Sequence, residues 1–134
     1  FSEDMLCVCS EIEKDNITHL AELNINLILW ILEKLDIKTE MLVSSDLGIG
    51  GKRTTRLIEI LHKLQVDGFL SPGSAMEYLE EDDFSSQTSV DLIFQEFDPA
   101  PYQQRNHHAF ESHLSILDVV ANLGWEGTRQ YICL

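Results

Sequence analysis

Short segments that favour β-strands alternate with single helical segments through the middle of the chain. The predicted strands are residues 39–43, 68–70 and 90–97, and the predicted helices between them are residues 52–65 and 74–79. Single helices between strands favour parallel pairing with right-handed crossovers, because each helix covers one face of the sheet. The sequence therefore predicts an α/β fold: a small, mostly parallel three-stranded sheet with flanking helices, like one half of a Rossmann fold.

The segments on either side of this alternation are helical or irregular. Residues 2–14 and 20–35 carry apolar side chains at helical spacing, and the second helix is apolar nearly all round, so we expect it to be buried on two sides. Residues 98–110 show little periodicity and predict a long loop of the kind that often has a function. A last helix is expected from Ser112 to Leu123, where Gly124 stops it.

The length of 134 residues fits one domain. Within it we expect a helical part over residues 1–37 and an α/β part over residues 38–134. The chain begins at Phe1 in an acidic stretch, without an initiator Met or the basic and apolar layout of a signal peptide. We expect a fragment or a processed product.

The formal net charge of −14 limits the partners that this chain can have. An acidic surface repels nucleic-acid phosphates and anionic lipids, so we expect neither nucleic-acid nor membrane binding. The apolar run from Leu27 to Leu32 is too short to cross a bilayer. Cys7 and Cys9 lack the spacing of redox or zinc sites, and they indicate reduced thiols in a cytoplasmic protein.

The stretch SSDLGIGGKRTTRLIEIL, residues 44–61, gathers basic side chains at a predicted helix start. Lys52, Arg53 and Arg56 are three of the nine basic residues, and free backbone N–H groups at such a position favour an anion. A Walker A loop would need Gly at position 46 and Ser or Thr at position 53, and the glycines do not fit a dinucleotide motif either. The stretch is either an anion-binding site or a glycine turn with solvated cations.

Polar residues follow each predicted strand, and ligands of parallel sheets bind beyond the carboxyl ends of the strands. We expect a small molecule with a phosphate or carboxylate group, held by a basic helix start and oriented by polar strand ends. The holding residues are Gly51, Lys52 and Arg56, and the orienting residues are Ser44, Ser71 and Gln95. Asp46 and Asp118 are the candidate general bases, and each is equally plausible as a capping or helix-face carboxylate.

Three histidines, His107, His108 and His113, lie near Glu111 and could in principle bind a metal. Their spacing matches no pattern such as H-E-x-x-H, and adjacent histidines in a polar loop are more often solvated. We therefore predict no metal site. The sequence does not identify a cofactor or an oligomeric state.

Several segments, in their order and spacing, resemble the WbqC-like family of bacterial proteins. The matching segments are LNINLILWILEKLDIKTEMLVSSDL, GKRTTRLIEILHKLQVDGFLSPGSAMEYLEEDDF, DLIFQEFDPAPYQQ and HLSILDVVANLG. The family pattern is also matched at Ser45 and Tyr102, which the resemblance adds to the ligand-binding set. Arg53 and the loop around the histidines depart from the pattern.

The resemblance implies a role in the biosynthesis of O-antigen or another bacterial surface polysaccharide. A cytoplasmic enzyme or binding protein for an activated sugar or acyl donor is the function that it suggests. The family is longer at the amino terminus, so the resemblance implies that this chain is a carboxyl-terminal portion. The alternative is a non-catalytic scaffold or partner-binding domain of the same pathway, which would use the acidic surface and the loop over residues 98–110.

Overall fold

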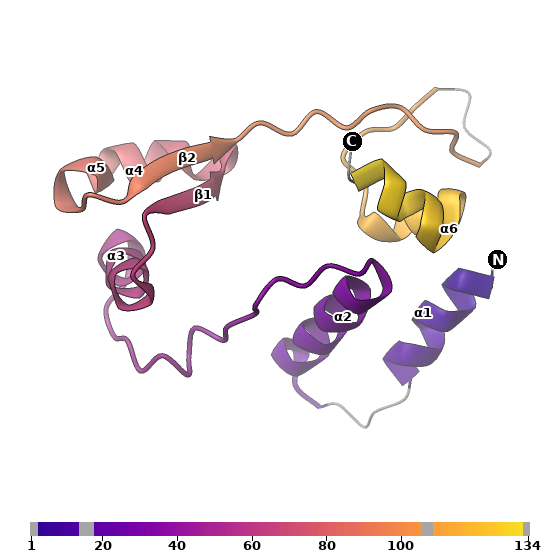
Figure 1. The fold of residues 1–134 in the computed structure, drawn as a ribbon, viewed down its shortest axis with the longest axis horizontal. Helices are drawn as coiled ribbons and strands as arrows, with labels where there is room; N and C mark the ends of the chain where they lie inside the picture. Colours follow the sequence, from indigo (N-terminus) through magenta and orange to yellow (C-terminus); the bar gives the residue numbers. More distant parts are fainter. Residues whose placement is uncertain (1–2, 14–17, 106–108, 133–134) are drawn as a thin grey trace. The chain divides into compact units, whose positions relative to one another are not determined.

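The structure is a computed structural model that describes residues 3–13, 18–105 and 109–132. The chain divides into two compact units (Figure 1). The central unit is residues 41–98, and the discontinuous unit is residues 1–40 together with 99–134. The carboxyl-terminal residues thus group with the amino-terminal helices, whereas the sequence placed them in the α/β part.

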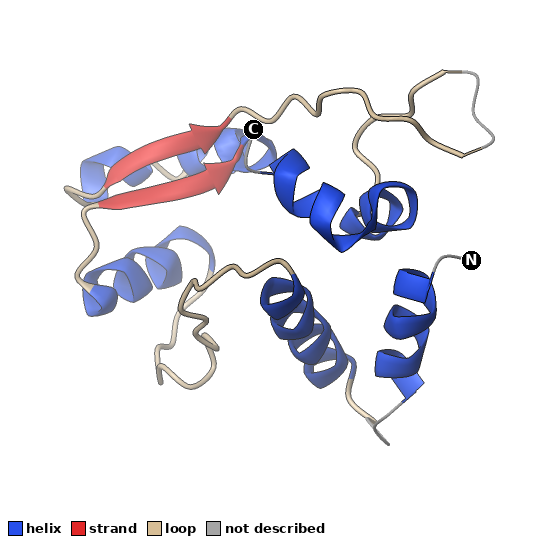
Figure 2. Ribbon diagram, turned by 45° about the vertical axis from the view of Figure 1, so that its right-hand side comes forward, coloured by secondary structure: helices blue, strands red, loops and turns tan. Residues whose placement is uncertain are grey.

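The central unit contains a small parallel sheet and short helices. Its elements are α3 (Arg53–Leu64), β1 (Gly68–Pro72), the 3-10 helix η1 (Gly73–Ala75), α4 (Met76–Glu81), α5 (Phe84–Gln87) and β2 (Asp91–Gln95). The two strands lie side by side and point in the same direction, as Figure 2 shows, with Ser71 opposite Phe94. The helices between them form the crossover that parallel pairing requires.

The expectation of three strands was wrong for the part of the chain that the structure describes. Residues 39–43 form no strand there, and Met41 and Leu42 are exposed. The sheet has two strands, so neither the third strand nor the Rossmann-like half is confirmed. The mixed helix and strand character of the fold is confirmed.

One face of the sheet packs on the core of the central unit. Phe69, Leu92 and Phe94 point to the same face and pack against a buried cluster that includes Leu79 and Phe84. From α3, the apolar stripe that the sequence shows supplies Leu57, Ile58 and Leu61 to this core. The core fixes the position of α3 and therefore of the polar residues at its start.

The discontinuous unit is helical, with α1 (Glu3–Glu13), α2 (Leu20–Lys34) and α6 (Ile116–Ile132). Trp30 of α2 packs edge-to-face on Trp125 of α6, with ring centroids 5.2 Å apart. The Arg129 guanidinium donates to the carbonyl oxygens of Lys34 and Leu35, at 2.9 and 3.1 Å, and so caps the carboxyl end of α2. Over the described ranges, no helix has the length and apolar character that crossing a bilayer would require.

Gly124 interrupts α6 but does not end it. Its backbone lies in the left-handed region (φ 69, ψ 175), so the helix kinks at the position where the sequence predicted a stop. A further helical segment follows, and the Thr128 hydroxyl donates to the Gly124 carbonyl oxygen at 2.7 Å. Thr128 is fully buried, so the segment after the kink is also packed into its unit.

Candidate functional site

A hollow of about 330 Å³ opens at the start of α3, and we call it the α3 hollow. It is lined by Lys52, Arg53, Thr54, Thr55, Asp82 and Gln87. Lys52 is the N-cap residue and has an extended backbone, and no side chain caps the helix at this position. The first N–H groups of a helix lack intrahelical partners, so this wall of the hollow presents hydrogen-bond donors. Two of the three cations that the sequence singled out therefore line one hollow.

The Asp82 carboxylate occupies part of the α3 hollow. Its Oδ2 accepts a 2.6 Å hydrogen bond from the Thr54 hydroxyl and lies 3.2 Å from Nε of Arg53. A second carboxylate, from Glu81, lies 4.0 Å from the same guanidinium. A carboxylate near a helix N-terminus also interacts favourably with the helix dipole. The chain thus supplies an anion of its own at the position where the sequence predicted a bound one.

Lys52 and Thr55 keep their polar groups available in the same hollow. Both side chains are exposed, and Lys52 forms no ion pair with any residue that the structure describes. Gln87 donates to the carbonyl oxygens of Asp82 and Asp83, which orients its amide at the rim. The hollow therefore combines one paired cation, Arg53, with one unpaired cation, Lys52.

The glycine-rich loop supports the start of α3. Gly51 has a φ of 81°, which favours glycine, and a Cβ at this position would lie 3.6 Å from Cβ of Arg56. The Lys63 ammonium of α3 donates to the carbonyl oxygen of Leu47 and so connects the loop to the helix. The glycine-rich loop thus precedes a helix start at which Arg53 is in an ion pair and Lys52 is exposed.

Ser44, Ser45 and Asp46 lie in an exposed turn that precedes this loop. The Ser45 hydroxyl donates to the Asp46 carboxylate at 3.2 Å. No strand ends before this turn, because residues 39–43 are not a strand. The turn therefore lacks the geometric basis on which the sequence placed these residues at a strand end.

Ser71 and Gln95 lie on the two strands, and neither lines the α3 hollow. Ser71 is 1% exposed, and its hydroxyl has no hydrogen-bond partner among the described residues. Gln95 is exposed at the end of β2, opposite Pro72. The structure thus brings together Lys52 with Arg53, Thr54 and Thr55, and it places Ser71 in the buried face of the sheet.

Tyr102 and Asp118 meet in the discontinuous unit, in a set of hydrogen bonds that we call the Tyr102–Asp118 network. The Tyr102 hydroxyl donates to Oδ2 of Asp118 at 2.6 Å, and Nε2 of Gln104 donates to the same oxygen at 3.1 Å. Gln104 also exchanges two hydrogen bonds with the backbone of Glu111. Burial, followed by the Asp118 hydrogen bond, raises the pKa of Tyr102 above its ordinary value. The network connects Tyr102, Gln104 and Glu111 to α6.

Rings and a second amide extend this network. The Tyr102 ring lies 5.2 Å from Phe110 and 5.3 Å from Tyr131, both edge-to-face. Asn122 accepts from the backbone N–H of Arg105 at 2.8 Å. Tyr102 and Asp118 were predicted from the sequence and Gln104 was not, because a Gln in a polar loop gives no sign of being buried; here it is 8% exposed. The Asp118 carboxylate, a candidate general base, accepts hydrogen bonds from Tyr102 and Gln104, and these bonds hold the two residues in place.

The predicted absence of a metal site concerns His107, His108 and His113. His107 and His108 lie outside the described residues, and His113 has an Nδ1 that lies 2.9 Å from the Ser112 hydroxyl. In the ranges that the structure describes, no group of three His, Cys, Asp or Glu side chains could hold a metal ion. The histidine prediction stays a prediction.

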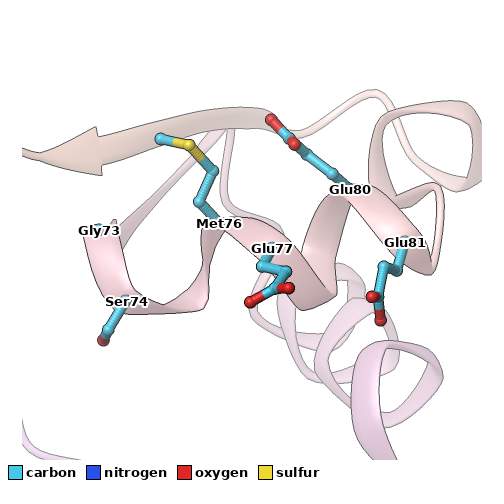
Figure 3. Close-up of a pocket in the computed structure, with 6 residues that line it drawn as sticks. All are labelled: Gly73, Ser74, Met76, Glu77, Glu80 and Glu81. Atoms are coloured by element: carbon cyan, nitrogen blue, oxygen red, sulfur yellow. The ribbon is translucent and has the colours of Figure 1, made fainter.

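A second hollow, of about 460 Å³, lies along α4 (Figure 3). Its lining residues are Gly73, Ser74, Met76, Glu77, Glu80 and Glu81. Three of these six carry carboxylates and none carries a positive charge, so this hollow repels an anion. Of the two hollows in the central unit, the α3 hollow alone has cations in its lining.

Comparison with known proteins gives one match. The model of the WbqC-like protein family matches residues 1–130, so the pattern extends over the amino-terminal residues and is not limited to a carboxyl-terminal part. No curated protein and no solved structure matches the chain. The match supplies a family and names no substrate.

Proposed function

Because the chain belongs to the WbqC-like protein family, we propose that it binds a small metabolite with a phosphate or carboxylate group at the α3 hollow. The proposed metabolite is an activated sugar or acyl donor of bacterial surface-polysaccharide biosynthesis, and the proposed location is the cytoplasm. The protein is an enzyme or a binding protein for this metabolite. The observation that carries the proposal is the Lys52 ammonium, which has no ion-pair partner among the described residues and lines the same hollow as Arg53 at the start of α3.

The α3 hollow has the donors that an oxyanion requires. Lys52 supplies a mobile ammonium, Thr55 a hydroxyl, and the first turn of α3 backbone N–H groups. Arg53 pairs with Asp82 in the structure, and an incoming phosphate competes with that carboxylate for the guanidinium. A volume of about 330 Å³ is enough for the anionic group and part of a small ligand.

The other predicted site residues keep supporting roles in this proposal. Gly51 and Arg56 lie just before and within the first turn of α3, where a Cβ added at Gly51 would lie 3.6 Å from Cβ of Arg56. Ser44, Ser45 and Asp46 lie in the turn that precedes that loop, where Asp46 is exposed and hydrogen-bonded to Ser45. Asp46 is therefore the candidate general base that lies in the same compact unit as the α3 hollow.

Calorimetric titration of the full chain tests the proposal. The ligands are inorganic phosphate, a nucleotide sugar and an acyl-CoA, and we expect at least one organic ligand to bind more tightly than phosphate. Lys52→Ala should weaken that binding by about tenfold, which corresponds to about 1.4 kcal/mol for one lost charge-assisted contact. Lys38→Ala is the matched control, since it removes an exposed lysine from the other unit and should leave the affinity unchanged.

Two outcomes would overturn this proposal. The first is that no ligand binds at millimolar concentration, and the second is that Lys52→Ala and Lys38→Ala have the same effect. Circular dichroism of both variants confirms that they are folded before binding is compared.

A second candidate function, a partner-binding domain, rests on the bare face of the sheet. Leu70 and Ile93 lie opposite each other on β1 and β2 and are 61% and 55% exposed. Parallel sheets are normally covered on both faces. Asp91 shares this face, so the partner would present basic side chains around an apolar segment. Leu70→Glu should abolish capture of such a partner, and capture that survives this change would exclude the face as its binding site.

A further inference from the structure

Helix α2 carries apolar side chains on two opposite sides. One side faces its own unit, where Trp30 packs on Trp125. The other side, which we call the α2 face, has the i, i+4, i+7, i+8, i+11 spacing of a helical stripe. It consists of Ala21, Ile25, Ile28, Leu29 and Leu32.

The α2 face is only partly covered: Ala21, Ile28 and Leu29 are exposed, and Ile25 and Leu32 are half-buried. None of the residues of α2 is buried, although a helix that is apolar on both sides is expected to be covered on both. Ile28 is 46% exposed and Leu29 is 45% exposed. By contrast, α1 buries Val8 and α6 buries Val120. The discontinuous unit therefore covers one side of α2 and leaves the other for something else.

A hollow of about 290 Å³ lies at the carboxyl end of the α2 face, and we call it the α2 hollow. Leu29, Leu32 and Ile37 form its apolar wall. The other lining residues are Glu33, Asp36, Lys38 and Thr39. The face thus has an exposed side chain at Ile28, a hollow with an apolar wall next to it, and charges of both signs around the hollow.

These three properties make the α2 face complementary to itself. A two-fold axis places the same patch on both subunits, so protruding side chains of each subunit can fill a hollow of the other. The Lys38 side chain is 86% exposed, and its Nζ lies 3.5 Å from Oδ1 of Asp36. In a dimer, Lys38 can pair with Asp36 of the second copy in place of its own Asp36. A patch with carboxylates alone would repel its own copy.

We propose that the α2 face is a homodimer interface, in which two copies of this chain pair about a two-fold axis. Ile28 of each subunit enters the α2 hollow of the other, and Lys38 pairs with Glu33 or Asp36 of the partner subunit. The apolar contact drives association, and the charge pairs fix the orientation. The proposal does not depend on ligand binding at the α3 hollow, which lies in the other unit.

The net charge predicts an unusual salt dependence for this dimer. Two copies that each carry a net charge of −14 repel each other at long range. At physiological ionic strength, salt largely screens this repulsion between charges more than about 8 Å apart. Added salt should therefore strengthen the dimer. Association with a basic partner would weaken under the same conditions.

Sedimentation of the full chain over about 5 to 500 μM, at low and high salt, tests the interface. The unmodified chain should form dimers within this range, more readily at high salt. Leu29→Glu should leave monomers throughout, because it places a charge in the apolar wall of the α2 hollow that receives Ile28 of the other subunit. Leu20→Glu is the matched control: Leu20 is 72% exposed on the same helix but off the α2 face, so dimers should persist.

If Leu29→Glu disturbs folding, charge-reversal variants at Lys38 and Asp36 still test the interface. Lys38→Glu should raise the dissociation constant about two- to fivefold, the size expected of an exposed pair. The double variant Lys38→Glu with Asp36→Lys again has one positive and one negative side chain at these positions. It should recover the dissociation constant of the unmodified dimer. A monomer at all concentrations and salts would overturn the proposal, and so would equal effects of Leu29→Glu and Leu20→Glu.

Discussion

The Thr54 hydroxyl donates a 2.6 Å hydrogen bond to the carboxylate of Asp82, 28 residues further along the chain. Thr54 is 3% exposed, whereas Asp82 is partly exposed, so the bond joins the buried first turn of α3 to the end of α4. The same oxygen also faces the Arg53 guanidinium. Asp82 therefore stabilises the start of α3 and competes with any anion that enters the α3 hollow.

Replacing Asp82 should separate these two effects. Asp82→Asn removes the negative charge but keeps the size, so we expect the free energy of unfolding to fall by about 1–2 kcal/mol. The freed Arg53 should raise phosphate affinity several-fold. Chemical denaturation and calorimetry measure the two quantities. Glu80→Gln is the control, because it removes a carboxylate of the same segment that does not line the α3 hollow. Equal phosphate affinities in the two variants would contradict the competition.

The Tyr102–Asp118 network should be structural. Tyr102→Phe removes the donor of its 2.6 Å hydrogen bond and leaves a carboxylate short of one partner. We expect a loss of about 1–3 kcal/mol in the free energy of unfolding and faster amide exchange in residues 99–105 and 109–111. Tyr78→Phe, on α4, should change neither quantity. If amide exchange in those residues is as slow in Tyr102→Phe as in the unmodified chain, the network does not hold the loop.

The raised pKa of Tyr102 gives a pH dependence of known sign. In the unfolded chain the phenol loses its proton near its ordinary value of 10.0, while in the folded chain it keeps the proton to higher pH. The unfolded state then binds fewer protons, so stability falls as the pH rises from about 10 to the folded pKa. Denaturation at a series of alkaline pH values should show a steeper fall for the unmodified chain than for Tyr102→Phe. Parallel curves would mean that Tyr102 titrates alike in both states.

Ser71 should be replaceable without loss of stability. Its hydroxyl is buried and has no partner among the described residues, so folding removes it from water without a compensating hydrogen bond. Ser71→Ala should stabilise the chain by about 1 kcal/mol. Thermal unfolding measures this, with Ser74→Ala as an exposed control. A destabilised Ser71→Ala would indicate that the hydroxyl has a partner in solution.

The sequence predicts best where a pattern is local. The helical stripe of residues 52–65 and the strand-forming residues 90–97 correspond to α3 (Arg53–Leu64) and β2 (Asp91–Gln95). The strand expected at residues 39–43 is not found, because strand-forming residues need a neighbouring strand for their backbone groups. Gly124 ends the first helical segment of α6 as expected, but a local pattern does not show that a second helical segment follows the kink.

The candidate site was harder to predict because its contacts are distant in the sequence. The sequence shows Lys52 and Arg53 as a cluster of cations. Asp82, the ion-pair partner of Arg53, lies in an acidic run that is typical of a solvated surface. Of these two cations, Arg53 is the one that forms an ion pair among the described residues. Gln104 gave no signal, because its role depends on Tyr102 and Asp118 meeting in space.

Amide chemical shifts measured during a phosphate titration test the central claim most directly. We predict that the N–H signals of Arg53, Thr54 and Thr55 move progressively and saturate, that the signals along α4 beside the acidic hollow stay in place, and that Lys52→Ala reduces the movement. If the amides at the start of α3 do not move at millimolar phosphate, or if they move equally in Lys52→Ala, the α3 hollow is not an anion-binding site.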